Sequence, residues 1–216
     1  MQSKLHSALC MSEHIIIPAI IPQSREHLHA ALGMMWGVAF EFQIDIVDGV
    51  FVPEMLPEAV SYELDLMIDE PMETLARWLA PHPKSVVLHI ESFAHDEDIT
   101  KAIGMVRTAG VRAVLASLND TPLEHLLAFV PQSDGVQCMG IAGIGAQGNP
   151  FDERVVERVR RIRRAYPALS ISVDGSMNTD TIPLLKAAGA NRFVVGSAIF
   201  DSVDPIQSYR DLYALV

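Results

Sequence analysis

The chain is poor in cysteine and has no long apolar run. Its 216 residues include only Cys10 and Cys138, too few for a disulfide scaffold or a four-ligand zinc site. We therefore expect both thiols to be free and the protein to be cytoplasmic. No stretch of about 18 residues is free of both charge and proline, so the sequence predicts no transmembrane helix.

Positive charge is also scarce, because 16 lysine and arginine residues face 27 aspartate and glutamate residues. The formal net charge of −11 argues against a nucleic-acid or anionic-membrane partner. It leaves phosphorylated metabolites open as ligands, since backbone N–H groups can hold a phosphate. Half of the residues are apolar and 20% are charged, so we expect a folded chain with one sizeable core.

No linker and no low-complexity tract divides the chain. Residues 1–14 lack the apolar region of a signal peptide, and we interpret them as a tail before the first strand. We assign residues 15–216 to one domain.

Short apolar runs alternate with amphipathic stretches from residue 15 onward. The runs are rich in β-branched residues, as buried parallel strands are. The predicted strands are Ile15–Ile21, Val38–Ile46, Tyr62–Ile68, Ser85–Ile90, Arg112–Leu118, Gly135–Gly140, Leu169–Val173 and Arg192–Gly196. The predicted helices are Arg25–Leu32, Met72–Leu79, Asp96–Ala109, Pro122–Val130, Asp152–Tyr166, Thr179–Ala188 and Pro205–Leu215.

Strands that alternate with helices in this way predict a (β/α)8 TIM barrel. The alternative, a doubly wound sheet, usually carries G-x-G-x-x-G after its first strand, where this chain has Pro22-Gln23-Ser24. Between Asp48 and Tyr62, Pro53 and Pro57 leave no room for an ordinary helix interior. We therefore expect a shortened or missing second helix, with a flank that a second subunit could cover in a homo-oligomer.

Polar residues at the C-terminal ends of the strands are the candidates for function, because barrel enzymes place their active sites there. Asp45, Asp65 and Asp174 lie within apolar runs, where a carboxylate must neutralise, pair or bind a cation. None of the four lysines lies at such an end. We predict functional roles for Asp45 and Asp174, and leave a structural role equally open for Asp65. His89 is either an active-site base or a hydrogen-bonded core residue.

Glycine-rich turns follow the last three predicted strands. They are Gly143 to Gly148, Asp174-Gly175-Ser176 and Gly196-Ser197-Ala198. The loops after strands seven and eight form the usual phosphate site of this fold, although each glycine alone could simply make a tight turn. Three such turns at one end of the barrel favour phosphate binding.

Several segments, taken in order, resemble the ribulose-phosphate 3-epimerase family. Gln43 to Glu54 resembles the family's H-V-D-V-M-D-G-H-F-V-P-N signature at strand two. The family's D-V-H-L-M-I, V-H-V-E, P-G-F-G-G-Q, V-D-G-G and A-G-S-A-I-F segments are similar to Glu63–Ile68, Leu88–Glu91, Ala142–Gln147, Val173–Ser176 and Val195–Phe200. The similarity runs from about Ile16 to the C-terminus.

The resemblance implies an isomerase of the pentose phosphate pathway that interconverts ketopentose 5-phosphates by proton transfer at C3. In that family two aspartates serve as acid and base, and a divalent metal held by both aspartates and two histidines stabilises the enediolate. The resemblance places the catalytic pair at Asp45 and Asp174 and the metal ligands at Gln43, Asp45, Asp65 and Asp174. Met67 and His89 are further candidates near the substrate. The implied phosphate-binding residues are Gly143, Gly145, Ala146, Gln147, Gly175, Ser176, Gly196 and Ser197.

This chain departs from the family pattern around the substrate. Gln43 and Asp65 replace the two metal histidines, Ala19 a serine, Val50 a loop histidine and Ser176 a glycine. The oxygen ligands favour Mg²⁺ or Mn²⁺ over Zn²⁺, and a site without metal is the alternative. Two functions stay open: an epimerase-like isomerase, or a catalytically impaired phosphosugar-binding or interaction protein on the same barrel.

Overall fold

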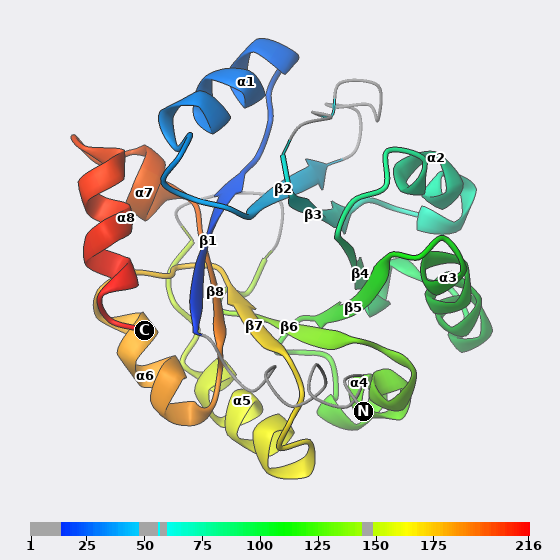
Figure 1. The fold of residues 1–216 in the computed structure, drawn as a ribbon. Coiled ribbons are helices and arrows are strands. Elements are labelled where there is room, and N and C mark those ends of the chain that lie inside the picture. The colour runs from blue at the N-terminus through cyan, green and yellow to red at the C-terminus, as the bar shows by residue number, and fades with distance from the viewer. Residues whose placement is uncertain (1–13, 48–55, 57–59, 144–148) are drawn as a thin grey trace, which may run out of the picture.

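The predicted apolar runs form one closed barrel of parallel strands, in chain order from β1 to β8 (Figure 1). The computed structural model describes residues 14–47, 56, 60–143 and 149–216. The strands are β1 Ile15–Ile20, β2 Phe42–Val47, β3 Tyr62–Met67, β4 Ser85–His89, β5 Arg112–Ser117, β6 Gly135–Met139, β7 Ile171–Asp174 and β8 Arg192–Val195. The predicted (β/α)8 fold is confirmed.

Helices surround the barrel (Figure 1). They are α1 Arg25–Met34, α2 Leu75–Leu79, α3 Asp96–Thr108, α4 Leu123–Phe129, α5 Arg154–Ala165, α6 Thr181–Ala188, α7 Ser197–Phe200 and α8 Pro205–Tyr213, with 3-10 turns η2 Pro71–Glu73, η3 Ile90–Ser92 and η4 Val130–Gln132. Polar caps fix some of the starts, as where Ser24 Oγ accepts the N–H of His27 at 3.1 Å. Within the described ranges, no helix has the length and apolar character needed to cross a bilayer.

Two of the differences between the predicted and the observed element boundaries concern the second strand and the helix after the third. The second strand begins at Phe42 instead of Val38, because α1 extends to Met34 and the chain turns at Gly37, whose φ is 73°. The helix predicted at Met72–Leu79 is divided at Thr74 into η2 and α2. The shortened or missing second helix was predicted between Asp48 and Tyr62. Most of that segment, residues 48–55 and 57–59, lies outside the described residues, so this stays a prediction.

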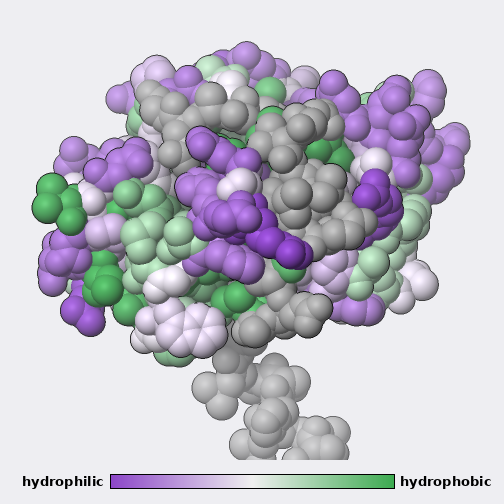
Figure 2. Space-filling model, turned by 90° about the horizontal axis from the view of Figure 1, so that it is seen from above, coloured by the Kyte–Doolittle hydropathy of each residue, from purple (hydrophilic) through white to green (hydrophobic). Residues whose placement is uncertain are grey.

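Alternate residues of each strand face the helices or the barrel interior. Those that face the helices, such as Ile44, Leu64 and Leu115, join one large apolar cluster. Inside the barrel, the small clusters are Ile17 with Ala19 and Val194, and Val87 with Val114 and Ala116. Other strand positions carry buried polar side chains: Gln43, Asp45, Glu63, Asp65, Ser85, His89, Gln137, Ser172 and Arg192. One outer side, in contrast, shows mostly hydrophilic residues with scattered hydrophobic ones (Figure 2).

Charges at the N-terminal end of the barrel are paired with one another. The Arg192 guanidinium donates to Glu63 at 2.7 Å, to Glu41 at 3.0 Å and to Ser172 Oγ at 3.1 Å. Lys84 also pairs with Glu41. Because these charges compensate one another, the buried groups that call for a chemical explanation are the aspartates at the opposite end of the barrel.

Candidate active site

The three predicted aspartates converge inside the C-terminal part of the barrel. Asp45 on β2 is in register with Asp65 on β3, and Asp174 ends β7. One carboxylate oxygen from each lies within 4.8 Å of those from the other two. The inward positions of three separate strands therefore bring together carboxylates that are far apart in the sequence.

The amide of Gln43 lies among these carboxylates. Its Nε2 donates to Asp45 Oδ1 at 2.8 Å and to Asp174 Oδ2 at 2.9 Å, with a longer bond of 3.4 Å to Asp65 Oδ2. Its Oε1 is buried without a hydrogen-bond partner among the described groups. Since a half-turn of an amide exchanges its oxygen and nitrogen, Gln43 can offer this cluster either donors or an acceptor.

Asp65 accepts short hydrogen bonds on both of its oxygens. His89 Nε2 lies 2.7 Å from Oδ1, and Gln137 Nε2 donates to Oδ2 at 2.7 Å. All three side chains are buried. The structure thus places His89 in contact with Asp65, deep in the barrel.

Gln137 is the residue of this cluster that the sequence analysis missed. It lies in the middle of the apolar run Gly135–Met139, where it is the one strongly polar side chain. That interruption was visible in the sequence, but a lone glutamine has no spacing that ties it to a carboxylate on another strand.

The environment raises the pKa of two of the aspartates. Burial raises the pKa of Asp45 well above its usual range, and the charges of Asp174 and Asp65 add to the effect. Burial, together with the charge of Asp65, raises the pKa of Asp174 to about 7. Burial alone would lower the pKa of His89, but the charge and hydrogen bond of Asp65, together with the charges of Glu91 and Asp174, raise it. Two carboxyl groups with raised pKa values in one site are suited to carry protons near neutral pH.

The donor set fits a hard divalent cation. Oxygen ligands of one Mg²⁺ ion lie at most about 4.2 Å from one another. The three carboxylates present oxygens that lie within 4.8 Å of one another, so small side-chain shifts would let them share such an ion. The unpaired Oε1 of Gln43 can supply a fourth oxygen after an amide turn. Cys138, the cysteine among the described residues, belongs to the outer apolar cluster and supplies no soft ligand here. The chemistry of these donors favours Mg²⁺ or Mn²⁺ over Zn²⁺.

The turn after β7 lies next to Asp174. Gly175 has a φ of 99°, and a side chain there would meet Ile141 Cγ1 at 2.8 Å, so only glycine fits. The carbonyl of Ser176 accepts a hydrogen bond from Thr181 Oγ1 at 2.9 Å, which fixes the turn against the start of α6. Gly196 and Ser197 hold the equivalent place between β8 and α7.

The other candidate residues are less fully placed. Gly143 is exposed after β6, while Gly145, Ala146 and Gln147 lie outside the described residues. Met67 ends β3, two residues after Asp65 and therefore on the same face of the strand, and it is half-buried.

Comparison with known proteins gives consistent relatives. Residues 15–200 match the model of the ribulose-phosphate 3 epimerase family. A ribulose-phosphate 3-epimerase of Mycobacterium leprae is 30% identical over 178 residues, which cover 75% of this chain and 77% of that protein. The cytoplasmic isoform of the same enzyme in Oryza sativa is 27% identical over 204 residues, or 88% of this chain and 89% of that protein.

Solved structures share the barrel at lower identity. A 3-hexulose-6-phosphate synthase superposes with a TM-score of 0.74 and 18% identity, covering 93% of this chain and 99% of that one. Orotidine 5'-monophosphate decarboxylase of Sulfolobus solfataricus gives a TM-score of 0.65 and 13% identity, covering 93% and 96%. At these identities, the likeness shows the fold alone.

Proposed function

The chain belongs to the ribulose-phosphate 3-epimerase family, and on this basis we propose that it interconverts ribulose 5-phosphate and xylulose 5-phosphate or a closely similar pair. The observation that carries the proposal is the pair formed by Asp45 and Asp174. Both carboxyl groups have raised pKa values, both face the barrel interior, and one amide bridges them at 2.8 and 2.9 Å.

Inversion of a carbon centre by proton transfer needs two proton carriers, one on each face. Asp45 and Asp174 come from β2 and β7, so they reach a substrate at the mouth of the barrel from different walls. An ionised carboxylate of the pair takes the C3 proton, and the protonated partner delivers a proton to the other face. In the reverse reaction the two residues exchange roles.

We assign Gln43, Asp45, Asp65 and Asp174 as the ligands of a divalent cation, Mg²⁺ or Mn²⁺. When bound, such a cation stabilises negative charge that develops on substrate oxygens. Without a cation, the NH₂ group of Gln43 gives the two proton-carrying carboxylates a shared donor, which offsets part of their mutual repulsion.

The turn at Gly175–Ser176 and the start of α7 at Gly196–Ser197 would hold the substrate phosphate. Among the described turns and loops, the backbone N–H groups of Ser176 and Ser197 donate no hydrogen bond to another backbone group. They are therefore available to an anion. Gly143, Gly145, Ala146 and Gln147 remain further candidates for phosphate binding, as the family resemblance implies.

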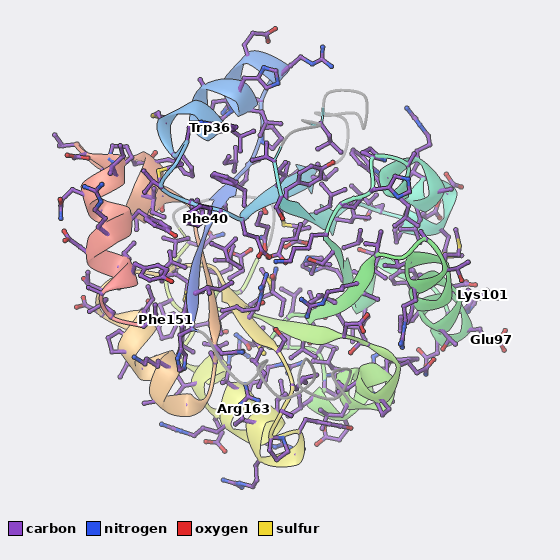
Figure 3. All side chains as sticks on the ribbon, viewed as in Figure 1. Trp36, Phe40, Glu97, Lys101, Phe151 and Arg163 are labelled. Carbon is purple, nitrogen blue, oxygen red and sulfur yellow. The ribbon has the colours of Figure 1, made fainter. Side chains whose placement is uncertain are left out.

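We also expect self-association and a cytoplasmic location. Trp36 and Phe40 lie between α1 and β2 and are 68% and 85% exposed, which is unusual for large apolar side chains (Figure 3). A second copy of the chain could cover them. The location follows the Oryza sativa relative, whose name describes a cytoplasmic isoform.

The test is to incubate the pure protein with ribulose 5-phosphate and follow xylulose 5-phosphate by NMR, with Mg²⁺, Mn²⁺, Zn²⁺ or EDTA in parallel samples. We expect conversion that is fastest with Mg²⁺ or Mn²⁺. Calorimetry on the same samples distinguishes the alternative function. Binding of the sugar phosphate without conversion under any condition would favour the catalytically impaired binding protein.

A further inference from the structure

The proposed proton transfer does not account for Gln137 on β6. This side chain is completely buried, at 0% exposure, and crosses the barrel interior to donate to Asp65 on β3 at 2.7 Å. Among the described residues, β6 makes no other side-chain hydrogen bond to the three aspartates. The strand therefore contributes a single side-chain polar contact to the site.

A buried glutamine is costly unless its amide is bonded. Gln137 uses its NH₂ group on Asp65, while its Oε1 is buried without a partner among the described groups. The residue in register with it on β5, Ala116, belongs to a small apolar cluster. On β7 the residue in register is Ser172, whose hydroxyl accepts from Arg192. Among the described residues, the side-chain hydrogen bond of Gln137 is the one to Asp65.

Asp65 is held from three strands. His89 from β4 contacts Oδ1 at 2.7 Å, and Gln137 from β6 donates to Oδ2 at 2.7 Å. Gln43 from β2 makes a longer bond to Oδ2 at 3.4 Å. Two short bonds to different oxygens fix the rotation of a carboxylate that would otherwise turn easily about its last torsion.

We propose that Gln137 is a positioning residue, which together with His89 fixes the Asp65 carboxylate as an oxygen ligand for the divalent cation. The inference rests on the cation site assigned under the proposed function. Groups that hydrogen-bond to metal ligands typically contribute about 10–100-fold to metal affinity, because they set the orientation of the ligand. Without Gln137, the oxygen Oδ2 keeps only the long bond to Gln43.

The experiment measures Mn²⁺ binding by calorimetry on the full chain, without substrate. Gln137→Met keeps the length of the side chain but removes the donor, and Gln137→Asn keeps the donor but is too short to reach Asp65. We expect the dissociation constant for Mn²⁺ to rise about 10–100-fold in both variants. The matched control is Tyr62→Phe on β3, which removes a buried hydroxyl that has no described partner and should leave Mn²⁺ affinity unchanged.

Mn²⁺ affinities of both variants within about twofold of the wild type would overturn the inference, as would a wild type that binds no Mn²⁺. Loss of the fold in both variants, seen by circular dichroism, would show a structural role and also overturn it. A wild type that binds Mn²⁺ but does not convert ribulose 5-phosphate counts against the proposed function only, because the binding measurement needs no turnover.

Discussion

At the scale of single residues, the aspartates of this barrel differ in what surrounds them. Asp65 accepts short bonds from His89 and Gln137, whereas Asp45 and Asp174 share one amide with each other. Burial is the main cause of the raised pKa values of Asp45 and Asp174, and the hydrogen bonds from the shared Gln43 amide offset only part of it. The same residue type can thus supply an anchored ligand at one position and proton carriers at two others.

The thiol of Cys138 illustrates the opposite case, a titratable group without a chemical role. It is fully buried, and burial raises its pKa to about 12. Since the thiolate is the reactive form, we expect no reaction of Cys138 with an aromatic disulfide reagent in the native state. The measurement uses Cys10→Ser protein, so that Cys138 is the one remaining thiol. The reagent should release one equivalent of coloured thiolate only after guanidinium has unfolded the protein. Rapid release from native protein would contradict this assignment.

At the scale of elements, the strands were predictable and their polar interior was only partly so. The alternation of apolar runs with amphipathic stretches predicted all eight strands, since buried parallel strands leave this pattern. Asp45, Asp65 and Asp174 could be identified as candidates because carboxylates interrupt apolar runs at the C-terminal ends. Gln137 could not be identified from the sequence, because its role depends on a hydrogen bond across the barrel to Asp65, which a local sequence pattern does not show.

The starts of elements were less predictable for a similar reason. The fifth predicted helix, expected from Asp152, begins at Arg154 with Glu153 as its N-cap, and the Asp152 carboxylate before it accepts the N–H of Arg154 at 3.1 Å. The hydrogen bond from the Arg154 side chain, helped by one from Asn119, lowers the pKa of Asp152 to about 2. The pKa of an aspartate in an unfolded chain is about 3.9. The ionised Asp152 carboxylate therefore stabilises the fold above that pH, and this stabilisation is lost as the pH falls toward 2.

Asp152→Asn keeps an oxygen that can accept the N–H of Arg154 but removes the charge that pairs with the Arg154 side chain. It should therefore destabilise the protein by about 0.2–1 kcal/mol at pH 7, the range for exposed ion pairs. The difference from the wild type should shrink as the pH falls from about 4 toward 2, because the carboxylate becomes protonated first in the unfolded chain. Urea unfolding at a series of pH values checks both points. A difference that stays constant down to pH 3 would show that the charge of Asp152 is not what stabilises the helix start.

The N-terminal ends of β3 and β8 are joined by the buried ion pair of Arg192 with Glu63, and Arg192 also pairs with Glu41. Arg192→Met leaves Glu63 buried without its cation, which should cost about 3–5 kcal/mol of unfolding free energy. Adding Glu63→Leu removes the stranded charge, so the double variant should be more stable than Arg192→Met alone. Urea unfolding of the two variants makes the comparison, and a double variant that is weaker still would refute this account of the pair.

At the scale of the whole molecule, the two ends of the barrel interior carry opposite electrostatic arrangements. Arg192 neutralises glutamates at the N-terminal end, while the three aspartates at the C-terminal end have only His89 and two amides among their described side-chain partners. In an acidic chain of net charge −11, such a concentration of carboxylates is stable only with protons or a cation to offset it. Both options are compatible with the proposed proton transfer.

The central claim is that Asp45 and Asp174 act on opposite faces of C3, and solvent exchange tests it most directly. Wild type, Asp45→Asn and Asp174→Asn are incubated in heavy water with ribulose 5-phosphate or xylulose 5-phosphate, and deuterium at C3 is followed by NMR. The wild type should exchange and invert both sugars. Each variant should lose inversion, with kcat lower by about 10²–10⁴-fold, yet still exchange the C3 proton of one sugar, a different one for each variant. Either of two results would contradict the two-carboxylate account: a variant that exchanges the C3 proton of neither sugar, or a variant that still inverts C3 as fast as the wild type.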